Sequence, residues 1–136
     1  MFDMNKLLCA VFITLFSLPC QAMTEYKSDL ICPIGGEKFE AVLAGSGTSF
    51  GNYLDLKPYG PTPAPWPIAK CPSNGFVIFK NSFTPTEREK LKSFVETEQY
   101  QLLQKKYSNY YLAAKLKENL GVAKREIAHT LLQATW

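Results

Sequence analysis

Apolar side chains in the second half of the chain recur at the three- and four-residue spacing of helices. The pattern predicts three or four helices between residues 84 and 136, with starts near Pro85, Thr97, Asn109 and Ala123. Thr84 and Glu87 have the spacing of a capping box, with a proline at the first helical position. Gly121 is typical of the residue that follows a helix.

The first half of the chain shows alternation and short β-branched or aromatic runs instead of helical periodicity. These runs predict three short strands, at residues 39–43, 53–57 and 75–79. Residues 58–67 contain closely spaced prolines, which exclude a helix or a central strand and favour an extended loop. We therefore predict an α+β protein, with a β and loop unit at residues 23–83 and a helical tail at 84–136, packed as one compact unit.

Residues 1–22 have the pattern of a secretory signal peptide. Lys6 precedes a run of twelve apolar or small residues at 7–18, which is too short to span a bilayer, and small residues allow cleavage after Ala22. Attachment of a lipid to Cys20 is an alternative, but Pro19 fits a lipidation site poorly. The sequence predicts a periplasmic or secreted protein with no transmembrane segment after cleavage.

Composition and charge narrow the possible classes of function. The chain has 136 residues, 46% of them hydrophobic, which suits one globular domain. Its net charge of +3 is too small to be a nucleic-acid footprint, so we expect no nucleic-acid partner. Removal of residues 1–22 leaves Cys32 and Cys71, and an even pair in an exported protein predicts a disulfide. The bond would close a loop of about 40 residues and contribute about 4 kcal/mol.

The two remaining cysteines begin similar segments, Cys-Pro-Ile-Gly-Gly from Cys32 and Cys-Pro-Ser-Asn-Gly from Cys71. Each resembles a zinc knuckle of the form Cys-Pro-x-Cys-Gly, with the second cysteine replaced by Gly35 or Asn74. Glycine and asparagine both tolerate positive φ, so the turn shape can persist without the metal ligand.

The chain thereby resembles an uncharacterised bacterial family in which paired Cys-Pro-x-Cys knuckles precede tetratricopeptide-like helices. The resemblance implies a small zinc-ribbon-like β unit that has lost half of its metal ligands. Zinc would need two ligands besides Cys32 and Cys71, and the only histidine, His129, lies in the last helix. We therefore expect no metal and no cofactor, and a direct bond between the two cysteines. A zinc-dependent binding module stays an alternative.

Candidate catalytic residues form no convincing set. Residues 47–51 match the G-x-S-x-G elbow of serine hydrolases around Ser49, but that motif needs a helix after it, and Pro58 follows too soon. A hydrolase using Ser49 and His129 remains an alternative, as does thiol redox chemistry at Cys32, which lacks a Cys-x-x-Cys partner. We predict that the protein is not an enzyme.

Aromatic residues are the candidate binding residues: Trp66, Tyr107, Tyr110 and Tyr111. Trp66 either packs on the core within a stiff surface loop or presents a rigid aromatic ligand. The tyrosines either belong to the helical core or line a groove for a peptide, as in stacked helical repeats. The sequence thus predicts a non-catalytic periplasmic module, stabilised by a disulfide, that binds another protein or a peptide.

Overall fold

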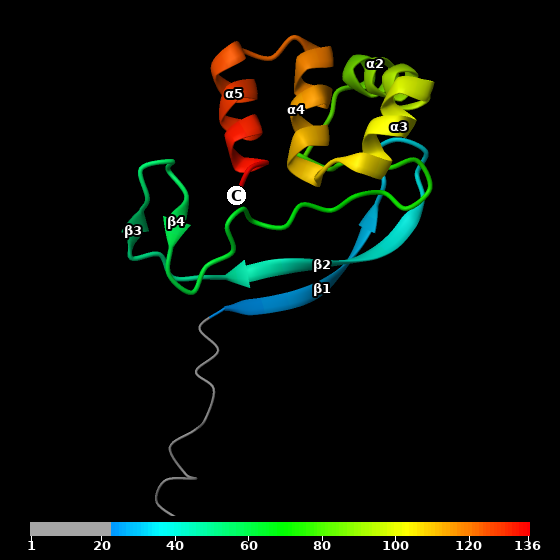
Figure 1. Cartoon of the computed structure of the whole chain (residues 1–136). Coiled ribbons are helices and arrows are strands. Elements are labelled where there is room, and N and C mark those ends of the chain that lie inside the picture. The colour runs from blue at the N-terminus through cyan, green and yellow to red at the C-terminus, as the bar shows by residue number, and fades with distance from the viewer. Residues whose placement is uncertain (1–22) are drawn as a thin grey trace, which may run out of the picture.

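The computed structural model describes residues 23–136, in which antiparallel β hairpins are followed by four helices (Figure 1). The predicted signal peptide, residues 1–22, and the alternative lipid site at Cys20 lie outside the described residues. The strands are β1 (Thr24–Ile31), β2 (Lys38–Ser46), β3 (Gly51–Asn52) and β4 (Pro58–Tyr59). The helices are α2 (Pro85–Val95), α3 (Glu98–Lys106), α4 (Asn109–Leu120) and α5 (Lys124–Gln133).

The longest β element is the hairpin of β1 and β2, which runs below the helices in Figure 1. Its register pairs Leu30 with Phe39 and Ser28 with Ala41, and these four residues are half-buried while their sequence neighbours are more exposed. The strand expected at residues 39–43 is confirmed within β2. β1 has no counterpart in the sequence prediction, because most of its residues are polar.

The strand expected at residues 53–57 is wrong, because this segment is the turn that joins β3 to β4. The N–H of Tyr53 donates to the carbonyl of Lys57 at 2.9 Å and closes the turn. Leu56 has a φ of +66°, a left-handed conformation that a strand does not allow. The alternation in the sequence therefore belongs to a tight hairpin with Leu54 and Leu56 exposed at its tip.

The strand expected at residues 75–79 is also wrong, since only an isolated bridge between Lys70 and Val77 forms there. The segment is apolar because it fills the core: Phe76 and Val77 have no exposed surface. A backbone bond from Ile78 to Ala69, at 2.9 Å, continues the pairing beyond the bridge.

The four helices begin within one residue of the predicted positions. Side-chain caps mark the starts of α2, α3 and α4, whereas Ala123 at the start of α5 makes no side-chain cap. Thr97 and Ser108 cap the N-termini of α3 and α4 through their hydroxyl groups, and Gly121 ends α4 with a φ of +78°. Among residues 23–136, no helix has the length and apolar character needed to cross a membrane.

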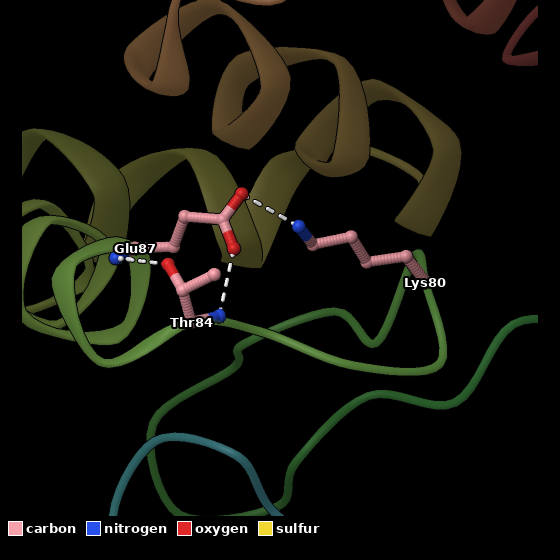
Figure 2. A network of polar contacts seen from close by, with 3 residues as sticks. All are labelled: Lys80, Thr84 and Glu87. Atoms are coloured by element: carbon pink, nitrogen blue, oxygen red, sulfur yellow. Dashed lines mark hydrogen bonds and ion pairs between the residues drawn. The ribbon is translucent and has the colours of Figure 1, made fainter.

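The capping box of α2 is present and is joined to the preceding loop by an ion pair (Figure 2). The Thr84 hydroxyl accepts a hydrogen bond from the Glu87 N–H at 3.2 Å, and the Glu87 carboxylate accepts one from the Thr84 N–H at 2.8 Å. Lys80 Nζ lies 2.6 Å from the other oxygen of Glu87. The hydrogen bond from Lys80, and then that from the Thr84 backbone, lower the pKa of Glu87.

One core joins the β and loop unit to the helices. The loop unit contributes fully buried residues near its two cysteines, and α2, α3 and α4 cover them from the other side. The largest fully buried side chains of this shared core are those of Tyr100, Phe76, Leu91, Leu112 and Leu116. The hydroxyl of Tyr100 donates to the carbonyl of Gly75 at 2.9 Å, and burial raises its pKa.

Candidate functional site

The two cysteine segments fold into matching turns. In the first turn, the Cys32 N–H donates to the carbonyl of Glu37 at 2.8 Å, and the Gly36 N–H donates to the carbonyl of Cys32 at 3.1 Å. The second turn repeats both bonds from Cys71 and Gly75 at the same spacing, at 2.8 and 3.0 Å. Both trailing glycines have a φ of +73°, a conformation that favours glycine.

The predicted disulfide between Cys32 and Cys71 is present and joins these turns, with Cα atoms 5.7 Å apart. The two residues are 1% and 0% exposed, so the bond lies inside the core. A redox enzyme needs an accessible sulfur, so this burial favours a structural role over thiol exchange at Cys32. Within residues 23–136, no cluster of three or more His, Cys, Asp and Glu side chains is placed to hold a metal ion.

Two side chains cross between the turns. Asn74, in the second turn, donates from Nδ2 to the Ile34 carbonyl at 2.7 Å and accepts the Phe76 N–H at 2.9 Å. In the opposite direction, a Glu37 carboxylate oxygen accepts the N–H of Ser73 at 3.1 Å. Asn74 therefore binds the facing turn through its carboxamide and braces its own turn at the same time.

Ser49 lies in an exposed loop, and strand β3 follows it instead of a helix. Its Oγ donates to the Gly51 carbonyl at 2.9 Å and accepts the Gly51 N–H at 3.3 Å. Close packing explains why glycine stands on either side of Ser49. A Cβ on Gly47 would lie 2.9 Å from the Cα of Thr62, and a Cβ on Gly51 would lie 2.8 Å from the ring of Tyr59. The geometry of a nucleophile elbow is therefore absent around Ser49.

Tyr107 and Tyr111 form a stacked pair at the start of α4. Their ring centroids are 4.2 Å apart with planes inclined by 22°. Lys106 lies 5.4 Å from the centroid of the Tyr107 ring, and Lys115 lies 5.8 Å from that of Tyr111. Tyr107 is 38% exposed, so a partner can reach this pair only in part.

Tyr110 and Trp66, the other two candidate binding residues, contact each other. The Tyr110 hydroxyl donates to the Trp66 carbonyl at 2.8 Å, and burial raises the pKa of Tyr110. Asn109 holds the same loop by a bond from Nδ2 to the Ile68 carbonyl at 3.0 Å. Tyr110 therefore anchors the proline-rich loop, while Trp66 keeps 41% of its surface exposed instead of joining the core.

An apolar groove beside α5 is a candidate site that the sequence prediction missed. It has a volume of about 710 Å³ and is lined by Leu56, Ala123, Arg125, Glu126, Ala128, His129 and Leu132. The turn between β3 and β4 forms one wall and α5 the other. The overlooked signal was the pair of leucines in a polar turn, since Leu54 is fully exposed and Leu56 keeps 56% of its surface.

His129, in α5, lines this groove. Its ring packs edge-on against Trp136, with centroids 6.4 Å apart. The Lys57 ammonium group donates to the main-chain oxygen of Trp136 at 3.2 Å, which fixes the β3–β4 hairpin beside the end of α5. Both walls of the groove are thus tied to Trp136.

Comparisons of the chain with protein-family models, curated proteins and solved structures give no match. The function is therefore inferred from the residues and surfaces of this chain.

Proposed function

We propose that this chain is a non-catalytic protein-interaction module that acts in the periplasm or outside the cell. The predicted signal peptide supports export. The buried bond between Cys32 and Cys71 supports an oxidising compartment, because such structural disulfides persist there. The helical tail and the cysteine unit share one core, which gives a rigid support for a binding surface.

The groove beside α5 is the observation that carries this proposal. Its lining is mainly apolar, with small and aliphatic side chains that include Ala128 and Leu132, and it also contains the charged residues Arg125 and Glu126. Apolar depressions with a few charged groups in the lining suit an apolar anchor residue from a peptide. The partner is an extended or helical segment of another protein that inserts an aliphatic side chain and places charged residues near Arg125 and Glu126.

We also propose that the β unit is a zinc ribbon in which a disulfide replaces the metal. The matching backbone bonds of the two turns support this interpretation. The positive φ shared by Gly36 and Gly75 supports it as well, since a knuckle requires a residue of that conformation. The proposal extends the resemblance to the bacterial family with paired knuckles and assigns the cysteines a structural role.

Site-specific photo-crosslinking tests the interaction proposal. A photoreactive residue at Ala128, which is exposed in the groove, is expected to capture one defined protein in the exported fraction of the native host. The same residue at Lys90, exposed on α2 and outside the groove, is the matched control and captures nothing specific. Ala128→Glu, probed from a photoreactive residue at Leu56, removes the product because a charge enters the apolar lining.

A second position separates the two candidate surfaces. A photoreactive residue at Tyr107 reports on the stacked tyrosine pair. A specific product from Tyr107 but none from Ala128 would show that the partner binds at the tyrosine pair and not in the groove. Absence of any product from both positions contradicts the interaction module.

A further inference from the structure

The outer edge of β1 has backbone groups with no partner among the described residues. β1 pairs with β2 on one side only, and Figure 1 shows it as the lower strand of the hairpin. The Cys32 N–H, directly after β1, points toward β2, where it meets the Glu37 carbonyl. Because backbone groups alternate along a strand, the odd-numbered residues of β1 direct their N–H and C=O groups to the outer edge.

Charges along this edge are unbalanced. Asp29 lies directly opposite Glu40 in the ladder, and like charges in that position are destabilising. Lys27 forms an ion pair with Glu40 at 2.7 Å, and Asp29 has no ion pair with any residue between 23 and 136. The edge thus presents a cation and an unneutralised carboxylate two residues apart.

We propose that β1 pairs antiparallel with β1 of a second copy of this chain, with Ser28 at the centre of the register. In this register Lys27 lies opposite Asp29 of the second copy, and the reverse contact is made by symmetry. Glu25 lies opposite Ile31 of the second copy, so each odd-numbered residue exchanges backbone hydrogen bonds with an odd-numbered residue. The product is a four-stranded sheet in the order β2–β1–β1–β2.

The register also keeps the two faces of the sheet distinct. Tyr26 lies opposite Leu30 of the second copy, on the face that carries the half-buried side chains of Leu30 and Phe39. Tyr26 is 50% exposed in the single chain, so the pairing covers apolar surface in addition to the open edge. An open strand edge left unpaired is a general liability, which this pairing removes.

Neighbouring registers of the two β1 strands are less favourable because they bring like charges together or shorten the overlap. A register centred on Lys27 sets that lysine against itself, and one centred on Asp29 sets two carboxylates against each other. A register centred on Tyr26 pairs Glu25 with Lys27 but leaves Asp29 and Ile31 beyond the main overlap of the strands. The sequence of β1 is therefore complementary to itself in one main register, and this complementarity favours a second copy over a different protein.

Charge reversal on the edge tests the proposal with sedimentation equilibrium of the purified protein. The wild type is expected to form a dimer, and Asp29→Lys is expected to dimerise at least about tenfold more weakly, because two attractive pairs become repulsive. The same substitution relieves the clash of charges between Asp29 and Glu40, so the folded monomer is not weakened. Because dimer formation itself raises the thermal midpoint, the midpoints are compared at a protein concentration at which both chains are monomeric. A lower midpoint of the variant under those conditions would mark a folding defect instead of dissociation.

Mixing two variants gives the sharpest result. Lys27→Asp alone also loses the dimer, but an equimolar mixture with Asp29→Lys forms a heterodimer, since every opposing pair is again of opposite charge. Lys38→Asp, an exposed charge reversal on β2, is the control and leaves the dimer intact. A monomeric wild type at all concentrations overturns the proposal, as does an Asp29→Lys variant that dimerises as tightly as the wild type or a mixture without heterodimer. The groove beside α5 is a separate surface, so either proposal can fail without the other.

Discussion

The two cysteine turns have the same backbone and different surroundings. Gly36 lies at the exposed end of the β1–β2 hairpin, and a Cβ placed on it would meet no atom within 4 Å. Gly75 is buried, its carbonyl accepts the Tyr100 hydroxyl, and a Cβ on it would overlap the carboxamide of Gln104. Two similar local sequences thus produce the same turn, while the packed helices decide how much substitution each turn tolerates.

Loss of the disulfide is the largest change that affects both turns. Replacing Cys32 and Cys71 together by alanine is expected to reduce the free energy of unfolding by about 4 kcal/mol, because the unfolded chain gains the entropy of an open loop of about 40 residues. Urea unfolding of the double variant and the wild type measures this difference. A decrease of less than about 1 kcal/mol in the free energy of unfolding would show that the disulfide hardly restricts the unfolded chain.

Replacing each trailing glycine by alanine compares the stability contribution of the exposed turn with that of the buried turn. Gly36→Ala is expected to cost about 1 kcal/mol, since only the positive φ opposes the side chain. Gly75→Ala is expected to cost about 2–3 kcal/mol, because the new methyl group also displaces Gln104, which donates to Gln101 at 2.7 Å. Equal losses in urea unfolding would contradict the role assigned to the helices.

Removal of the crossing side chains tests how the turns hold each other. Asn74→Ala is expected to cost about 2 kcal/mol, since it leaves the Phe76 N–H and the Ile34 carbonyl without their partner. Glu37→Ala is expected to cost less than about 1 kcal/mol, because it removes one bond to an exposed residue, Ser73. Thermal unfolding ranks the two variants, and a larger effect at Glu37 would reverse the assignment.

The smallest effect concerns the loop that leads from the second turn into α2. The pKa of Glu87 is lowered in the folded protein by Lys80 and by the Thr84 backbone. The stabilisation is therefore present above the unfolded value of about 4.3 and is lost as the pH falls through the folded pKa. Glu87→Gln is expected to flatten the acid limb of the stability curve. Glu89→Gln, an exposed position on α2, is the matched control and leaves the limb unchanged.

Local signals predicted the parts of the fold that depend on nearby residues. Thr84, Thr97 and Gly121 placed the helix ends, because caps act within one turn of the chain. The pairing of Cys32 with Cys71 followed from counting, since only these two cysteines remain after the predicted cleavage.

Parts of the fold that depend on distant residues were not predictable in this way. Phe76 and Val77 form a short apolar run in either a strand or a buried loop, and only the helices packed on them decide which. Leu54 and Leu56 alternate like a strand, yet a left-handed residue bends the segment into a turn. The groove beside α5 needs this turn and the helix together, so neither segment alone indicated it.

The position of the disulfide in the chain also has a consequence for the order of assembly. Cys32 and Cys71 both precede Pro85, the first residue of α2, so an N-to-C synthesis delivers both thiols before any helix of the tail. In the finished protein the helices shield both sulfurs from solvent. The bond can therefore form before any helix of the tail is in place, and in the folded protein a reductant reaches the two sulfurs only when the core opens.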